Sequence, residues 1–154
     1  MSEGSSVRIA VVDDAVAVAR LLHDFNVEFQ TPTPGVAILT SRLRKLLRGS
    51  MTVAILAGEP AFGVALVTVR SNVWYDGHVA LLDELYVAPG RRNRGTGSAL
   101  IGELLSWART NNIDLIEINV DEGDVDAQRF YERHGFTSTD PTTNERAFYF
   151  FREL

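Results

Sequence analysis

The sequence predicts a mixed α+β protein built around one central sheet. Strand-like and helix-like patterns alternate at both ends of the chain, and a meander of strand-like runs with a hairpin signal lies between them. The 154 residues, of which 45% are apolar and 23% charged, suffice for one globular domain with its own core. We therefore expect a single domain over residues 1–154.

Local patterning gives each element its place in this scheme. Alternating apolar and polar residues predict strands, and apolar residues three and four positions apart predict helices. The expected elements are, in chain order, a strand at Val7–Val12, a helix capped by Asp13-Asp14 and reaching Phe25, a helix at Val36–Arg48, strands at Met51–Ala57, Phe62–Val69 and Val79–Val87, a helix at Ser98–Arg109, a strand at Asp114–Val120, a helix at Val125–His134 and a strand at Arg146–Arg152, with a further short strand near Phe136.

Composition excludes several classes of function. The chain has no cysteine, which rules out disulfides, thiolate metal sites and a cysteine nucleophile. With 20 acidic and 15 basic residues, the net charge of -5 argues against nucleic-acid binding and mildly favours a cationic partner. The three scattered histidines indicate no metal site. We see no membrane-spanning segment and no export signal, so we expect a cytoplasmic protein.

The segment Arg92–Gly97, Arg-Asn-Arg-Gly-Thr-Gly, follows an expected strand and opens an expected helix. Backbone N–H groups at a helix N-terminus are unpaired and meet the positive end of the helix dipole, so they bind anions. Glycines let the backbone approach a bulky group, and the arginines at 91, 92 and 94 add positive charge. This pattern favours a diphosphate site; the alternative is an ordinary glycine-rich connection with solvated arginines.

Two adjacent carboxylates, Asp83 and Glu84, interrupt the apolar strand around them. Because side chains alternate along a strand, we expect the two on opposite faces of the sheet. An unpaired buried carboxylate is costly, so at least one should face a wet cleft or a cationic partner. Both are candidates for a base or an amine-binding group, and the choice between them stays open. The alternative is that they pair with arginines or lie at an exposed strand end.

The residues around the Arg92–Gly97 loop resemble the acetyl-CoA signature of the GNAT acyltransferases. The likeness lies in Leu85-Tyr86-Val87-Ala88-Pro89, followed by Arg92, Gly95, Gly97 and Leu100. A second stretch resembles the other signature of that family, at Asp124, Ala127, Tyr131, Gly135 and Phe136. The expected order of elements also agrees with the family over nearly the whole chain, so the resemblance extends beyond one motif.

The resemblance implies an acetyl-CoA-dependent N-acetyltransferase with the GNAT fold, in which helices flank a mixed, mostly antiparallel sheet. It implies that the loop holds the diphosphate of acetyl-CoA and that the preceding strand hydrogen-bonds the pantetheine arm. Tyr131 would protonate the leaving thiolate; the alternative is a core tyrosine. Asp124 stands where the family often has Asn, and a carboxylate cannot donate that hydrogen bond. The implied cofactor-binding residues are Leu85, Tyr86, Val87, Arg92, Asn93, Arg94, Gly95, Thr96, Gly97, Ser98, Asp124 and Ala127.

The run 73–77 resembles the equivalent region of diamine and polyamine N-acetyltransferases, in which acidic residues at the positions of Asp83 and Glu84 engage the amine. The expected acceptor is therefore a small primary amine that attacks acetyl-CoA directly in a ternary complex. Trp74 is either a stacking partner for a cationic chain or a hairpin plug. Two alternatives are an acetyltransferase acting on N-terminal or lysine amines of proteins, and a non-catalytic acyl-CoA-binding module. The aromatic stretch 148–151 leaves a homodimer open.

Overall fold

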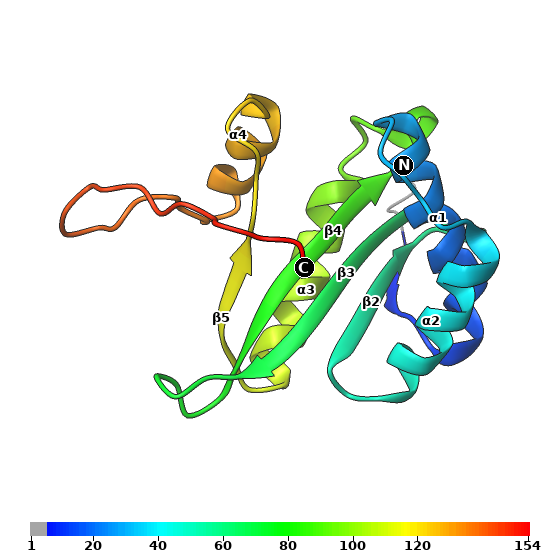
Figure 1. Cartoon of the computed structure of the whole chain (residues 1–154), viewed down its shortest axis with the longest axis horizontal. Coiled ribbons are helices and arrows are strands. Elements are labelled where there is room, and N and C mark those ends of the chain that lie inside the picture. The colour runs from blue at the N-terminus through cyan, green and yellow to red at the C-terminus, as the bar shows by residue number, and fades with distance from the viewer. Residues whose placement is uncertain (1–5) are drawn as a thin grey trace. The chain divides into compact units, whose positions relative to one another are not determined.

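Five strands form one mixed sheet in the order β1-β2-β3-β4-β5 in the computed structural model, which describes residues 6–154 (Figure 1). Neighbouring strands are antiparallel except β4 and β5, which are parallel. The strands are β1 (Val7–Ile9), β2 (Thr52–Ala57), β3 (Gly63–Ser71), β4 (His78–Val87) and β5 (Ile113–Ile118). The predicted mixed, mostly antiparallel sheet is confirmed.

The predicted helices are also present, with ends that differ by a few residues from the expected ones. They are α1 (Ala15–Glu28), α2 (Val36–Arg48), α3 (Thr96–Thr110) and α4 (Val125–Arg133), with 3-10 turns at Val12–Asp14 and Pro89–Arg91. The second helix has the predicted bounds, because Gly35 and Gly49 flank it on both sides.

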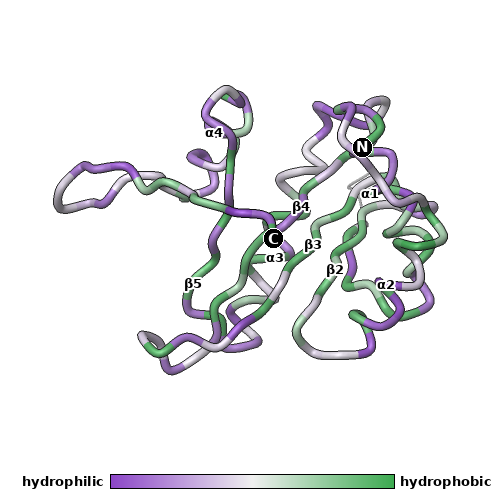
Figure 2. Tube along the Cα trace, in the orientation of Figure 1, coloured by the Kyte–Doolittle hydropathy of each residue, from purple (hydrophilic) through white to green (hydrophobic). Residues whose placement is uncertain are grey.

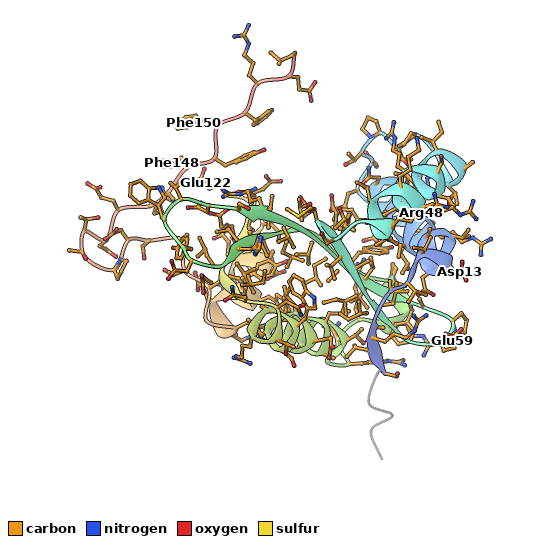
Figure 3. The ribbon with its side chains drawn as sticks, turned by 90° about the horizontal axis from the view of Figure 1, so that it is seen from below. Asp13, Arg48, Glu59, Glu122, Phe148 and Phe150 are labelled. Carbon is orange, nitrogen blue, oxygen red and sulfur yellow. The ribbon has the colours of Figure 1, made fainter. Side chains whose placement is uncertain are left out.

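The chain forms two compact units, Met1–Ile118 and Asn119–Leu154, called the first and second units below. In the first unit, α1 and α2 pack on one face of the sheet and α3 on the other (Figure 3). The central strands are hydrophobic along most of their length, as Figure 2 shows. Leu56 and Val64 lie under α1, and Leu100 and Leu104 bury the opposite face. A single domain over residues 1–154 stays a prediction.

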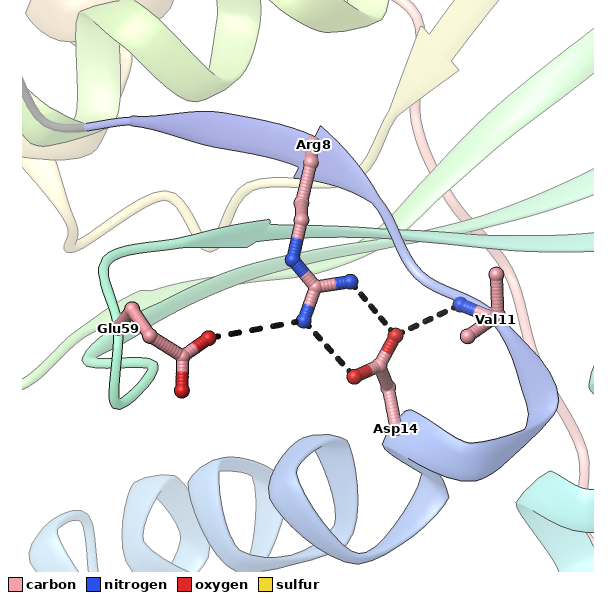
Figure 4. Close-up of polar contacts among 4 residues, drawn as sticks. All are labelled: Arg8, Val11, Asp14 and Glu59. Atoms are coloured by element: carbon pink, nitrogen blue, oxygen red, sulfur yellow. Dashed lines mark hydrogen bonds and ion pairs between the residues drawn. The ribbon is translucent and has the colours of Figure 1, made fainter.

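The first helix begins at a carboxylate that several groups share (Figure 4). Asp14 accepts two hydrogen bonds from the Arg8 guanidinium, at 2.7 and 2.8 Å, and one from the backbone N–H of Val11 at 2.8 Å. Glu59 lies 4.0 Å from the same guanidinium. The Arg8 bond, with that of Val11, holds the pKa of Asp14 below its ordinary value. The predicted strand ends early, at Ile9, because the chain enters the 3-10 turn Val12–Asp14 that leads into α1.

The second unit lacks the two strands predicted for it. Residues 146–152 and the region of Phe136 form no strand; the described backbone pairing is an isolated bridge between Thr139 and Arg146. The rings of Phe148 and Phe150 are 70% and 89% exposed and are labelled in Figure 3. An apolar aromatic run has strand propensity, but a strand also needs a partner ladder, which a single bridge does not supply. Both strand predictions are therefore wrong.

Candidate active site

The loop between β4 and α3 passes through two residues with positive φ. Asn93 has a φ of 62° and Gly95 a φ of 81°, and α3 begins directly afterwards at Thr96. Glycine adopts this left-handed conformation at no steric cost, which explains its place in the motif. A Cβ added at Gly95 would meet no atom within 4 Å, so open space borders this part of the backbone.

The first turn of α3 has no side-chain cap. Its N-cap is Gly95, which has no side chain that could accept a hydrogen bond from the first amides. The first amides of a helix have no carbonyl partner within the helix and lie at the positive end of its dipole, where an anion is stabilised. Thr96 is buried, and its methyl group packs against the backbone at Gly63, whereas Ser98 is exposed. This donor set fits the diphosphate of acetyl-CoA.

The three arginines of the loop differ in what they contact. Arg91 lies over the ring of Phe62, with its guanidinium carbon 4.8 Å from the ring centroid. Arg92 is ion-paired with Glu28 at 2.8 Å and donates from Nε to the carbonyl of Val87 at 2.9 Å. Arg94 is exposed and forms no ion pair within residues 6–154. The loop therefore carries two cations, Arg91 and Arg94, that no carboxylate within residues 6–154 neutralises.

The second half of β4 has an open edge. Its pairing with β5 ends at Leu82 opposite Ile118, whereas its pairing with β3 continues to Val87. Ala88 donates its N–H to the carbonyl of Phe62 on the β3 side. Because backbone groups along a strand point to alternate sides, Leu85 and Val87 direct theirs to the open edge. An extended ligand can pair there like an added strand, as expected for the pantetheine arm.

Tyr86, between these two residues, is held by the protein itself. By the same alternation, the backbone N–H and C=O groups of Tyr86 point toward β3, and the residue is 4% exposed. The ring meets Phe25 edge-on at 5.1 Å, and the hydroxyl donates to Glu28 at 3.2 Å. Burial, then the carboxylate of Glu28, raises the pKa of Tyr86. In the first unit, Tyr86 thus joins the open strand to α1.

A β-bulge lies at the two carboxylates. Val67 pairs with Leu82 and its neighbour Leu66 pairs with Glu84, so Asp83 is an extra residue on β4. Leu66 and Thr68 share one face of β3, so Glu84 lies on that face too, and Asp83 accepts a hydrogen bond from the Thr68 hydroxyl at 2.5 Å. Both carboxylates therefore lie on the same face. The prediction of opposite faces is wrong, because an extra residue interrupts the alternation.

Glu84 and Asp83 have different surroundings on that face. Cover by α1 and α2 ends here, since Val64 is buried and Thr68 exposed along the same row of β3. Asp83 is exposed, whereas Glu84 is half-buried and its side chain has no hydrogen bond or ion pair within residues 6–154. Burial, followed by the charge of Asp83, raises the pKa of Glu84 above its ordinary value. An unpartnered carboxylate with a raised pKa is a candidate proton acceptor.

Other sequence candidates lie away from the carboxylates. Trp74 is 84% exposed in the turn between β3 and β4, at the opposite end of β4 from Leu85. Five residues separate His78 from Asp83, which corresponds to about 17 Å along a strand. The first unit does not bring Trp74 to the carboxylates.

Within residues 6–154, no three His, Asp or Glu side chains gather as metal ligands would, and no helix there is long and apolar enough to span a membrane.

The residues of the second signature lie at the two ends of α4. Asp124 is the N-cap, and its carboxylate accepts the N–H of Ala127 at 3.1 Å. An Asp at this position satisfies one of the free donors of the helix start, a function that Asn shares. The spacing between Asp124 and Ala127 thus has a local structural cause, besides the contact with the cofactor arm that remains a prediction for both residues.

Tyr131 lies in the last turn of the same helix, where contacts of the helix end hold its side chain. Gly135 has a φ of 87°, and Phe136 donates its N–H to the carbonyl of Tyr131 at 3.1 Å, which is the Schellman pattern. The rings of Tyr131 and Phe136 meet edge-on at 5.8 Å, and those of Tyr131 and Phe130 meet edge-on at 5.1 Å. The Gly-Phe pair of the signature therefore fixes the ring of a half-buried Tyr131.

Sequence reasoning missed Glu28, which joins Arg92 and Tyr86. One signal was available: an acidic residue as the last of a helix lies at the negative end of the helix dipole, where it needs a compensating cation. Nothing in the local sequence indicates that the cation is 64 residues away. The bulge was missed for a similar reason, since register depends on the partner strand.

Comparison with known proteins agrees with these features. A protein from Arthrobacter sp. FB24, assigned as an acetyltransferase with no substrate named, is 51% identical, with a TM-score of 0.93 over 100% of this chain and 99% of that one. A soil-metagenome aminoglycoside acetyltransferase solved with sisomicin shares the fold, at 19% identity and a TM-score of 0.79 over 97% of this chain and 95% of that one.

Streptothricin acetyltransferase A of Bacillus subtilis (strain 168) is 28% identical over 97 residues, 57% of this chain, and the match spans about half of that relative, 54%. The model of the acetyltransferase (GNAT) family matches residues 17–136, which include strands β2 to β5, the loop after β4 and both signatures. The fold predicted from the resemblance is confirmed, and the chain belongs to the acetyltransferase (GNAT) family, whose enzymes take acetyl-CoA as acetyl donor.

Proposed function

We propose that this chain is an N-acetyltransferase that moves the acetyl group of acetyl-CoA to a primary amine in a ternary complex. The observation that carries the proposal is the arrangement along β4. An open strand edge at Leu85 and Val87 lies between an uncapped helix N-terminus and a pair of carboxylates that share one face of the sheet. Diphosphate, pantetheine arm and amine thus each meet groups of suitable chemistry within one stretch of chain.

Binding of acetyl-CoA is assigned to the loop and to the strand before it. The amides from Gly95 to Ser98 would hold the diphosphate, and the exposed Arg94 would add charge. Leu85 would pair with the pantetheine arm through both of its backbone groups, and Val87 through its N–H, because Arg92 already occupies the Val87 carbonyl. The thioester so held supplies an activated acyl carbon and a thiolate leaving group.

Proton movements are assigned to Glu84 and Tyr131. A primary amine is mostly an ammonium ion at neutral pH, so a base must remove its proton before or during attack. Glu84, unpartnered and with a raised pKa, is the proposed acceptor of that proton. Tyr131 is the proposed donor to the sulfur as the carbon–sulfur bond breaks. The products are the N-acetyl amine and CoA in its thiol form.

A small diamine or polyamine is the proposed acceptor class. Asp83, exposed and on the same face as Glu84, would hold a second ammonium group while the first is acetylated. Two carboxylates on one face without an arginine partner suit a substrate with two positive charges. The relatives' names add streptothricin and aminoglycosides to the acceptors worth testing.

Two other functions remain as alternatives. A protein acetyltransferase would acetylate N-terminal or lysine amines of peptides in preference to free amines. A non-catalytic module would bind acyl-CoA and release no thiol with any amine.

We also propose that the protein is cytoplasmic and forms a homodimer. Light scattering of the purified protein measures its mass in solution and so tests the dimer.

The test combines thermal unfolding with and without acetyl-CoA and a thiol-release assay. We expect acetyl-CoA to raise the melting temperature, because a ligand that binds the native state stabilises it, by about 2.7 kcal/mol at 100 times its Kd. The acceptor panel holds monoamines, diamines, polyamines, an aminoglycoside, streptothricin and short peptides. Turnover that favours diamines supports the proposal; turnover that favours peptides replaces it with the protein acetyltransferase. Binding without turnover of any member indicates the module, and no binding overturns all three functions.

A further inference from the structure

Glu28 occupies an unfavourable position that the acetyl-transfer chemistry does not explain. It is the last residue of α1, where the helix dipole is negative and disfavours a carboxylate. The charge is nevertheless held firmly: one Nη of Arg92 lies 2.8 Å from each of its two oxygens, and the Tyr86 hydroxyl donates at 3.2 Å. Three elements therefore meet at this carboxylate, namely α1, β4 and the loop before α3.

Arg92 in turn ties the loop to the strand. Its Nε donates to the Val87 carbonyl at 2.9 Å, and its guanidinium carbon lies 5.6 Å from the centre of the Tyr86 ring. The Arg92 and Glu28 side chains are 38% and 26% exposed, so water reaches the pair only in part. These bonds turn the Arg92 guanidinium back toward the end of β4 and neutralise its charge.

We propose that Glu28 is a positioning residue for acetyl-CoA binding, which acts through Arg92 to hold the start of the Arg92–Gly97 loop against β4. This inference rests on the proposed function. Holding Arg92 fixes where the loop leaves the strand, and hence where the amides of the first turn of α3 lie relative to the open edge at Leu85. Arg92 then holds the loop to the strand, and Arg91 and Arg94 are the loop cations without a carboxylate partner within residues 6–154 that can meet the diphosphate.

The proposal is testable because positioning and plain electrostatics predict opposite signs. Removing a negative charge beside an anion site should tighten anion binding by Coulomb attraction. Removing a positioning carboxylate should weaken binding, because the loop must then be ordered at the time of binding. In the Glu28→Gln variant the side-chain size is kept, the charge is lost, and the Arg92 guanidinium loses its ion pair and one of its two acceptor oxygens.

Isothermal titration of acetyl-CoA, with no amine present, measures the effect directly. For Glu28→Gln we expect the Kd to rise about fivefold to tenfold. The matched control is Asp24→Asn, which removes a negative charge one turn earlier on α1 from an exposed residue that has no ion pair within residues 6–154. Its Kd should stay unchanged or fall slightly. A Kd for Glu28→Gln that is unchanged or lower than that of the wild type overturns the proposal.

A double-mutant cycle with Arg92→Gln separates positioning from two independent structural effects. If the two residues act as one unit, the double variant should bind acetyl-CoA no more weakly than the worse single variant. Steady-state kinetics should show a higher KM for acetyl-CoA with kcat nearly unchanged, because Glu28 touches no reacting atom. Additive losses, or a loss confined to kcat, contradict the proposal. If the wild type itself binds no acetyl-CoA, the proposed function fails instead, so the two failures are distinguishable.

Discussion

The proposed base and the proposed acid are held in the protein by opposite means. Glu84 lies at a bulge of β4, half-buried, with no side-chain partner within residues 6–154 and a raised pKa. Tyr131 lies in the last turn of a regular helix, where the Schellman bonds of Gly135 and Phe136 and two ring contacts fix it. The side chain of the proposed base is thus left without a protein partner, whereas the ring of the proposed acid is held by neighbouring residues of its own helix end.

The difference shows that the proposed role of Glu84 depends on its basicity, whereas that of Tyr131 depends on the orientation of its hydroxyl. A carboxylate without a partner costs folding free energy and keeps its basicity for a substrate proton. A phenol of pKa about 10 is already neutral at pH 7, so it needs orientation more than activation. Substitutions at the two residues should therefore differ in magnitude, in pH dependence and in their effect on stability.

The largest effect is expected for Glu84→Gln. The amide cannot accept the proton of an ammonium whose pKa is about 10.4, so kcat should fall by about 100- to 1000-fold with the preferred amine. The Kd for acetyl-CoA should be unchanged, because the loop and the open edge remain. The wild-type kcat/KM should also fall as the pH drops through the raised pKa of Glu84, and that limb should vanish in the variant. Thiol release measured against pH checks both points.

The matched control for Glu84→Gln is Asp83→Asn. This variant changes the neighbouring carboxylate on the same face and leaves the proposed base in place. With a diamine we expect a higher KM of about fivefold, and with a monoamine little change, because only the second ammonium group loses its partner. If the two variants lose kcat equally, Glu84 has no special role as base, and the pair acts only as a source of negative charge.

A smaller effect is expected for Tyr131→Phe. A thiol of pKa about 8.5 leaves as its anion more readily than an amine loses its proton, so help from a proton donor matters less here. We expect kcat to fall about 10- to 100-fold, while the ring contacts with Phe130 and Phe136 remain. The Kd for acetyl-CoA from titration tells loss of chemistry from loss of binding. An unchanged kcat would remove Tyr131 from the proposed mechanism.

The sequence predicted the regular parts of the fold because their signals are local. The apolar face of α3 and the glycines around α2 are read from neighbouring residues, and the structure confirms both helices. The strand predicted at Arg146–Arg152 failed because strand formation depends on a partner. Four consecutive aromatic residues signal strand propensity, but they carry no information about which chain segment, if any, forms the other half of a ladder.

The site shows the same division between local and distant information. The loop with Gly95 is recognised from its motif, because a positive φ before a helix requires a particular residue type. The shared face of Asp83 and Glu84 depends on one extra residue opposite Leu66 and Val67, which a single strand does not reveal. The contact of Glu28 with Arg92 joins residues 64 positions apart. Types of chemistry were thus predictable, whereas register and long-range partners were not.

The smallest expected effect is on stability, and its sign follows from the raised pKa of Glu84. A carboxylate whose pKa is higher in the folded than in the unfolded state favours folding in its neutral form. Its contribution is fully present below the unfolded pKa of about 4.3 and is lost as the pH rises through the folded pKa. Glu84→Gln keeps a neutral side chain at every pH.

The melting temperature of Glu84→Gln should therefore match that of the wild type near pH 4 and exceed it by about 1–3 °C at pH 7, as expected for a gain below about 1 kcal/mol in a chain of this size. Thermal scans across that pH range, with Asp83→Asn beside them, measure the difference. A lower melting temperature for Glu84→Gln at pH 7 would mean that the ionised carboxylate stabilises the fold, and Glu84 would then be a structural residue with a partner rather than a base kept free for the substrate.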